Sequence, residues 1–96
     1  MITETEADQI AEEWVARASA PEDDVIINRR FTRAESFGWV YFYNTRRFID
    51  DGDLRSAIAG NAPIVVLRET GEVLVTGTAH SVDHYLDEIR TTYGGQ

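Results

Sequence analysis

The sequence predicts an α+β domain with the order helix, two strands, short helical insert, two strands and helix. Three observations lead to this prediction. Apolar residues recur at helical spacing near each end of the chain, at about 3–18 and 81–93. Four segments rich in β-branched and aromatic residues lie between these helices, and turn residues separate them in pairs. The simplest packing is one four-stranded antiparallel sheet with both long helices on one face.

The first helix begins at Thr3, because Thr3 and Glu6 have the spacing of a capping box. Its apolar stripe consists of Ala7, Ile10, Ala11, Trp14, Val15 and Ala18. The helix should end before Pro21, which has no backbone N–H to donate. We therefore expect an amphipathic helix that packs its stripe against the sheet.

The first pair of strands is predicted at residues 25–33 and 39–44, joined by a short connection. The second strand lies in Gly38-Trp39-Val40-Tyr41-Phe42-Tyr43-Asn44, so apolar side chains alternate onto both of its faces. We expect this strand to be central, because edge strands seldom carry apolar residues on both faces. A sheet covered on one side only should alternate apolar with polar residues. Either the insert at 45–59 covers the second face, or that face binds a partner such as another copy of the chain.

A turn introduces the second pair of strands. It is formed by Gly60-Asn61-Ala62-Pro63, in which Pro63 presets its own φ and keeps the residue before it out of the helical region. Strands at 64–68 and 73–78 then form a hairpin.

Two capped helices complete the expected secondary structure. The insert should be a loop followed by a short helix that Asp53 caps, and Ser81 should cap the last helix. The apolar side of that last helix consists of Val82, Tyr85, Leu86, Ile89 and Tyr93.

Length and composition restrict the possible functions. The 96 residues suffice for one domain with a single core. There is no cysteine, which excludes disulfides, thiolate metal sites and cysteine nucleophiles. No apolar run is long enough to span a bilayer, and the acidic N-terminal residues lack the pattern of a signal peptide. We therefore expect a cytoplasmic protein without a membrane partner.

The charge of the chain disfavours nucleic-acid binding. The formal net charge is −8, and an acidic surface repels phosphate backbones. The basic residues concentrate at Arg29, Arg30, Arg33, Arg46 and Arg47. Neighbouring aromatic residues such as Phe31 would suit base stacking, but the net charge argues against an RNA partner. A basic protein partner is compatible with this composition.

Motifs for metal binding and catalysis are weak. His80 and His84 are four residues apart, but His80 precedes the helix cap, and no third ligand has suitable spacing. The acidic segment 50–53 lacks the alternating ligands and the final glutamate of a calcium-binding EF-hand loop. No serine lies in a G-x-S-x-G motif. We therefore expect a non-enzymatic protein with no catalytic residues, no metal site and no cofactor.

The chain resembles the immunity protein 35 family, also called the YrhB domain. The resemblance covers nearly the whole chain and rests on the helix with Trp14, the two motifs beginning at Gly38 and Gly60, and the turn at 70–72. It implies a small cytoplasmic protein that neutralises a cognate bacterial toxin by binding it, with no catalytic residues to carry over. The residues of these motifs that we interpret as structural are Trp14, Trp39, Asn44, Gly60, Asn61 and Pro63.

Two functions remain. The first is a dedicated inhibitor that binds one toxin through a few anchor residues. The alternative, also described in this family, is a stress-related, chaperone-like protein that binds many unfolded clients. Promiscuous binders use flexible, methionine-rich surfaces, and this chain has a single methionine. The composition therefore favours the inhibitor.

The charge pattern also predicts a docking surface. Acidic loops at 22–24 and 50–53 border the first strand pair, and antiparallel pairing should bring both loops to the same end of the sheet. Carboxylates gathered around aromatic rings would hold a basic surface of the toxin, although ordinary solvated turns are an equally good interpretation. The candidate toxin-binding residues are Glu22, Asp23, Asp24, Tyr43, Phe48, Asp50, Asp51 and Asp53.

Overall fold

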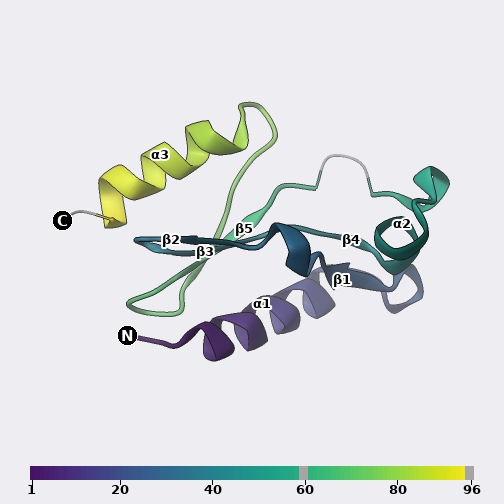
Figure 1. The fold of residues 1–96 in the computed structure, drawn as a ribbon, viewed down its shortest axis with the longest axis horizontal. Coiled ribbons are helices and arrows are strands. Elements are labelled where there is room, and N and C mark those ends of the chain that lie inside the picture. Colours follow the sequence, from purple (N-terminus) through teal and green to yellow (C-terminus); the bar gives the residue numbers. More distant parts are fainter. Residues whose placement is uncertain (59–60, 95–96) are drawn as a thin grey trace.

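A computed structural model describes residues 1–58 and 61–94 and confirms the α+β class (Figure 1). The long helices are α1 (Glu4–Ala18) and α3 (Val82–Tyr93), and the short one is α2 (Arg46–Asp51). The strands are β1 (Val25–Ile27), β2 (Arg33–Glu35), β3 (Gly38–Tyr41), β4 (Tyr43–Thr45), β5 (Ile64–Leu67) and β6 (Val73–Val75). Three 3-10 turns are η1 (Pro21–Asp23), η2 (Arg29–Phe31) and η3 (Leu54–Ser56).

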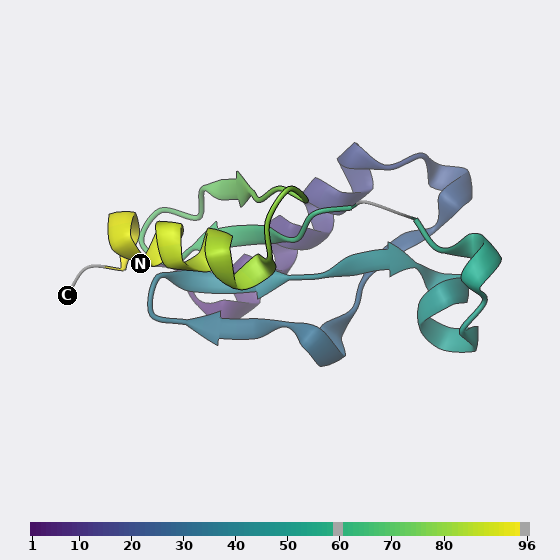
Figure 2. The same ribbon diagram turned by 90° about the horizontal axis from the view of Figure 1, so that it is seen from above.

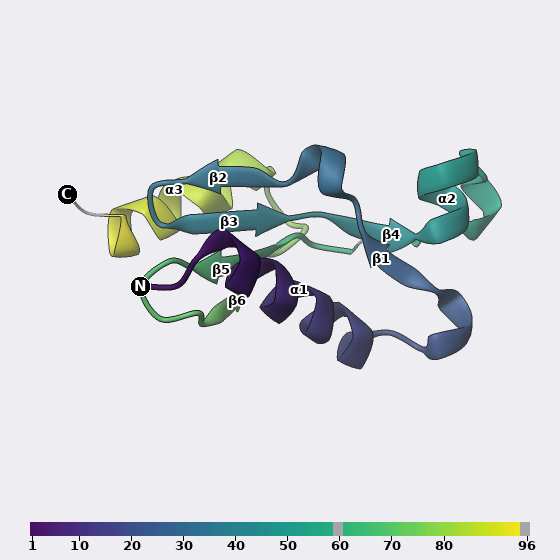
Figure 3. The same ribbon diagram turned by 60° about the horizontal axis from the view of Figure 1, so that its bottom comes forward.

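The strands form two antiparallel sheets instead of one. Four of them make a sheet in the order β2-β3-β5-β6, with α1 lying across one face (Figure 3). Strand β3 lies in its interior, which confirms the central position predicted for the strand at 39–44 as far as Tyr41. Tyr43 and Asn44 belong to β4, for which the prediction was wrong. The remaining two strands, β1 and β4, pair only with each other among the described residues.

The second sheet exists because each strand of the first predicted pair is interrupted. The first strand loops out three residues, Arg29–Phe31, as η2, so the predicted continuous strand at 25–33 was wrong. The second strand breaks at Phe42, whose carbonyl still accepts a hydrogen bond from Asn28 N at 2.7 Å. The two strands thus stay paired across the break, but with a register that shifts by the three extra residues.

The two long helices cover opposite faces of the four-stranded sheet (Figure 1). Trp39 and Tyr41 pack in one core cluster with α1, whereas Val40 packs in a second cluster with Leu86 of α3. The prediction that both helices lie on one face was therefore wrong. Neighbouring residues of β3 and β5 point to opposite faces, and all eight residues of the two strands are buried, so each face requires its own cover. Each face is covered by one long helix, α1 over Trp39 and Tyr41 and α3 over Val40, so the prediction that the insert or a partner covers one of them was wrong.

The insert also folds differently from the prediction. Its helix, α2, begins directly after Thr45, whose Oγ1 accepts a hydrogen bond from Phe48 N at 3.2 Å. The helix ends at Gly52, which adopts a left-handed conformation with φ 71°. Asp53 does act as a cap, but of the 3-10 turn η3, where its Oδ1 accepts from Arg55 N at 3.1 Å.

The predicted caps of the long helices are confirmed. Thr3 and Glu6 form the capping box of α1, with Thr3 N donating to the Glu6 carboxylate at 2.9 Å. Ser81 accepts from His84 N at 3.2 Å at the start of α3. The hairpin of β5 and β6 is also present, although β6 ends at Val75 and not at residue 78. The next residue turns toward β5, because the Thr76 hydroxyl donates to Pro63 O at 2.6 Å.

The molecule is elongated, with extents of 42 × 28 × 21 Å. Figure 2 shows α2 at one end of the long axis and the end of α3 at the other. The β1–β4 pair leads from the four-stranded sheet to α2, so the insert lies away from the main core (Figure 3). This separation leaves the end that carries α2 free to form a binding surface.

Candidate functional site

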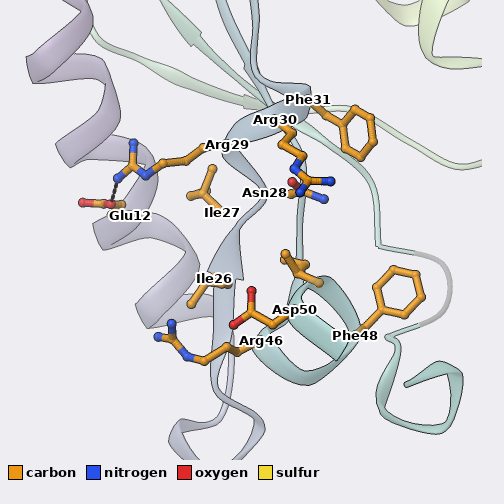
Figure 4. Close-up of a pocket in the computed structure, with 11 residues that line it drawn as sticks. Glu12, Ile26, Ile27, Asn28, Arg29, Arg30, Phe31, Arg46, Phe48 and Asp50 are labelled. Atoms are coloured by element: carbon orange, nitrogen blue, oxygen red, sulfur yellow. Dashed lines mark hydrogen bonds and ion pairs between the residues drawn. The ribbon is translucent and has the colours of Figure 1, made fainter. Parts of the chain in front are cut away.

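A cleft of about 700 Å³ opens at the α2 end of the molecule, between the β1–η2 segment and α2 (Figure 4). Apolar, aromatic and charged side chains all contribute to its wall. The lining residues are Glu12, Ile26, Ile27, Asn28, Arg29, Arg30, Phe31, Arg46, Phe48, Ile49 and Asp50. An adjoining pocket of about 220 Å³ shares Phe31 and Phe48 with the cleft. The two aromatic rings therefore belong to one continuous concave surface.

The loop-out of η2 creates one wall of this cleft. Because its three residues have no counterpart on the opposite strand, their side chains project from the sheet and do not pack into it. Phe31 is 59% exposed as a result, which is unusual for a phenylalanine. Arg30 is also exposed, and among the described residues it makes no ion pair. The wall thus offers an apolar ring beside a guanidinium group.

A short network fixes the position of Arg29 on the same wall. Its guanidinium pairs with Glu12 and lies 3.5 Å from the Asp8 carboxylate, both on α1. Asp8 in turn accepts a hydrogen bond from the Tyr41 hydroxyl at 2.7 Å. Burial raises the pKa of the Tyr41 phenol, and the hydrogen bond to Asp8 raises it further. The network ties η2 to α1 and β3.

The β1–β4 register brings the two acidic loops to the same end of the molecule. Val25 pairs with Thr45, so the loop before β1 and the helix after β4 are neighbours. Arg46 links them directly, because its backbone N–H donates to Asp24 O at 2.9 Å and its Nε donates to the Asp24 carboxylate at 2.9 Å. These contacts raise the pKa of Arg46. Arg46 therefore joins the acidic loop at 22–24 to the start of α2.

Three polar side chains hold the insert against the end of β4. The Asn44 Oδ1 accepts hydrogen bonds from Thr45 N and Ile58 N, both at 2.8 Å. The Thr45 hydroxyl, which is buried, donates to Ser56 O at 2.9 Å. The Asn61 side-chain amide donates to Tyr43 O. These bonds satisfy Thr45 N and Tyr43 O, which belong to β4, together with Ile58 N and Ser56 O of the insert, and they position α2 beside the cleft.

The acidic residues proposed from the sequence fall into two groups. Asp24 and Asp53 are used internally, because they form ion pairs with Arg46 and Arg55 at 2.9 and 3.6 Å. The other four acidic candidates, Glu22, Asp23, Asp50 and Asp51, are exposed and form no ion pair among the described residues. Asp50 lines the cleft (Figure 4).

The two aromatic residues proposed for the site have different surroundings. Phe48 lines both the cleft and the adjoining pocket. Tyr43 lines only the adjoining pocket, and its ring packs edge-on against Trp14 of α1, with the ring centroids 5.9 Å apart. Burial raises the pKa of the Tyr43 phenol. Tyr43 is thus shared between the core and the surface.

The remaining motif residues lie mostly in the interior. Trp39 is 3% exposed, and the Arg68 guanidinium lies over its ring at 4.3 Å from the centroid. Pro63 is buried, Trp14 is half-buried, and Gly60 lies outside the described residues. None of the described members lines the 700 Å³ cleft.

Within the part of the chain that the structure describes, no third ligand accompanies the two histidines. His80 and His84 stack with ring centroids 4.2 Å apart, but the described residues contain no group of three or more histidine, aspartate or glutamate side chains placed to hold a metal ion. Of the helices that the structure describes, none has the length and apolar character needed to cross a bilayer.

Sequence reasoning did not assign Glu12, Ile26 or Ile49 to the site. It did single out the arginines of η2 and the start of α2, but as a candidate for RNA stacking. The structure places three of them, Arg29, Arg30 and Arg46, on the cleft wall. The available signal was Arg-Arg-Phe inside a predicted strand, since three such residues seldom occupy successive positions of a half-buried strand.

Comparisons with known proteins agree with the resemblance noted from the motifs. The family model described as Immunity protein 35 matches residues 5–88. The chain is 30% identical over 97 residues to the Escherichia coli (strain K12) protein named "Uncharacterized protein YrhB", covering 98% of each protein. No solved structure matches the chain.

Proposed function

The chain belongs to the immunity protein 35 family, and we propose that it binds and neutralises a cognate bacterial toxin without catalysing a reaction. The family match over residues 5–88 is the observation that supports this function most directly. An inhibitor of this kind needs a stable scaffold and an exposed surface of distinct chemistry. The α2 end has both features, because it extends from a buried core and carries the mixed cleft described above.

We place the docking surface at this end and call it the acidic end. It is formed by the candidate residues Glu22, Asp23, Asp24, Tyr43, Phe48, Asp50, Asp51 and Asp53, together with the cleft between them. Exposed apolar side chains border it: Phe31 lies on η2, and Leu54 is 78% exposed on η3. A core of apolar anchors inside a charged rim is the usual anatomy of a protein interface.

The charge of the acidic end favours a basic partner surface. Glu22, Asp23, Asp50 and Asp51 form no ion pair among the described residues, and the chain carries a net charge of −8. Such a surface speeds encounter with a basic partner and disfavours acidic ones. Inside the rim, the Arg30 guanidinium can donate hydrogen bonds to a carbonyl or carboxylate group of the toxin.

The function can be tested with the product of the gene next to this one, which this proposal expects to be the toxin. Bacteria that produce this toxin should stop growing, and co-production of the chain should restore growth. Titration calorimetry with an inactivated toxin should give stoichiometric binding, because a dedicated inhibitor occupies one site. Alanine replacement of Phe31 and Phe48 together should weaken that binding and leave the circular dichroism spectrum unchanged.

Two results would contradict the proposal. One is a folded chain that neither restores growth nor binds the adjacent toxin. The other is suppression of aggregation of many unrelated unfolded proteins without selective toxin binding, which would favour the chaperone-like alternative.

A further inference from the structure

The two edges of the four-stranded sheet differ in how they are protected. Charged side chains guard the β2 edge: Arg33 pairs with Glu35 at 3.0 Å and with Asp83 at 3.3 Å, and Arg90 pairs with Glu35 at 3.0 Å. The β6 edge consists only of Val73, Leu74 and Val75. Native proteins usually block a free edge with charge, proline or a covering element, because an unblocked edge pairs with another strand.

The backbone of β6 is oriented for such pairing. Its hydrogen bonds to β5 involve alternate residues, as shown by Leu67 N donating to Glu72 O at 2.9 Å and Thr76 N donating to Pro63 O at 3.2 Å. In an antiparallel ladder the residues between them point their N–H and C=O groups the other way. Val73 and Val75 therefore direct these groups away from β5, along the open edge.

The side chains at this edge are apolar on both faces. Val75 is 59% exposed although it is β-branched and lies in a strand. On the α3 side, Leu74 borders a groove of about 280 Å³ that α3 completes with Tyr85, Ile89 and Tyr93. Tyr93 is itself 48% exposed. A strand added to β6 would therefore bury apolar surface as well as satisfying backbone groups.

The segment is also self-complementary. The segment is nearly palindromic about Leu74: a valine stands on each side of Leu74 and a glycine at each end. Its sequence is Gly71-Glu72-Val73-Leu74-Val75-Thr76-Gly77. Two-fold antiparallel pairing about Leu74 places Val73 opposite Val75 of the second copy, where their outward backbone groups can exchange hydrogen bonds. The same pairing places Glu72 opposite Thr76, so like charges do not face each other.

We propose that this chain forms a symmetric dimer by antiparallel pairing of β6 with β6 of a second copy, joining two four-stranded sheets into one continuous sheet. The two Leu74 side chains meet at the two-fold axis on the α3 side. The acidic end takes no part in the contact, so the dimer is independent of toxin binding and presents two such ends. Because only three residues pair in each copy, the contact is smaller than a standard interface of about 1,600 Å² and the dimer is a weak one.

Sedimentation velocity of the whole chain over a range of concentrations tests the dimer. The expected result is a reversible monomer–dimer equilibrium with a dissociation constant of about 10 µM to 1 mM. Added salt should strengthen it, because two chains of net charge −8 repel each other at low ionic strength. Val75→Lys should raise the dissociation constant at least about tenfold by placing a charge on the open edge. The matched control is Ala34→Lys on the β2 edge, which should leave the equilibrium unchanged.

Hydrogen exchange provides a second readout that needs no variant. The amides of Val73 and Val75 should exchange at least about tenfold more slowly at a concentration that favours the dimer than at one that favours the monomer. A chain that stays monomeric throughout would overturn the proposal. So would exchange at these amides that does not depend on concentration, or a dimer that Val75→Lys leaves intact or that Ala34→Lys dissociates to the same extent.

Discussion

Trp39 is confined to the interior by its neighbours on every side. It belongs to an interior strand, packs in the α1-side core cluster, and carries the Arg68 guanidinium over its ring. Arg68 is held in turn by Glu35 O, to which its Nη2 donates at 2.8 Å. Even the glycine before Trp39 is constrained, since a Cβ at Gly38 would lie 2.1 Å from Val66 O. Trp39 therefore contributes to stability and not to the binding surface.

Trp39→Ala should lower the free energy of unfolding by about 3–5 kcal/mol, because it leaves a large cavity in the core. Phe31→Ala is the matched aromatic control. Its ring is mostly exposed on η2, so the change should stay within about 0.5 kcal/mol. Urea denaturation followed by circular dichroism measures both. Equal losses of stability in the two variants would contradict the placement of one ring in the core and the other on the surface.

Tyr41 should make stability depend on alkaline pH. Its pKa in the folded chain is raised above the ordinary value of 10.0, chiefly by burial. The folded state therefore holds the phenolic proton more tightly than the unfolded state, so its contribution is fully present below pH 10 and is lost as the pH rises further. Tyr41→Phe should make the fall in stability above pH 10 shallower, leaving the part due to Tyr43. It should cost about 0.5–1.5 kcal/mol at neutral pH through the lost bond to Asp8. Thermal unfolding against pH gives both quantities, and an unchanged alkaline slope in Tyr41→Phe would argue against this assignment.

At the scale of the elements, local signals predicted the two long helices well, but the strands and the helix of the insert only in part. The caps at Thr3 and Ser81 and the interior position of β3 follow from side-chain chemistry and apolar pattern, and the structure confirms them. The loop-out of η2 could not be predicted, because it depends on which residues the opposite strand leaves unmatched. The helix of the insert was placed too late, since Thr45 and Asp53 are both good caps and only the packing of the insert selects Thr45 for α2.

The candidate site could likewise be predicted only in part. The convergence of the acidic loops follows from antiparallel pairing, and the β1–β4 register agrees with it. Their partial neutralisation by Arg46 and Arg55 was not anticipated, because ion pairs depend on side-chain geometry. The apolar stripe of the last helix indicated that this helix packs on the sheet. Such a stripe does not indicate which of the two faces of the sheet the helix covers. With β3 apolar on both faces, the assignment of α1 and α3 to opposite faces is the arrangement that buries both.

Asn44→Ala should release the insert from the β1–β4 pair. It removes the acceptor of two 2.8 Å hydrogen bonds, from Thr45 N and Ile58 N. The expected loss is about 1–3 kcal/mol, with faster hydrogen exchange at Ile58. Asn44→Asp keeps an oxygen acceptor in the same position and should protect Ile58 better than alanine does. Exchange at Ile58 that is equal in the wild type and Asn44→Ala would show that other contacts hold the insert.

On the scale of the whole molecule, the fold separates stability from recognition. The four-stranded sheet and its two helices contain nearly all of the fully buried side chains, whereas the α2 end has a half-buried insert, exposed apolar residues and unpaired carboxylates. Such an arrangement lets the binding surface change in sequence at little cost to the core. It also means that charge at the acidic end can be altered without unfolding the chain.

Removing the four unpaired carboxylates of the acidic end should therefore slow association with the toxin. The variant Glu22→Gln, Asp23→Asn, Asp50→Asn, Asp51→Asn leaves the Asp24–Arg46 ion pair and the Asp53 cap in place. We expect the association rate constant to fall by about tenfold or more at low salt, with a smaller difference at high salt, because steering of a basic partner is screened by ions. The matched control removes four carboxylates elsewhere that also form no ion pair among the described residues, at Glu4, Glu13, Glu69 and Glu72, and so changes the net charge by the same amount. Stopped-flow mixing at two salt concentrations distinguishes the cases. If both variants slow association equally, only the net charge of −8 matters and no local docking surface is needed; if neither does, the toxin docks on another face.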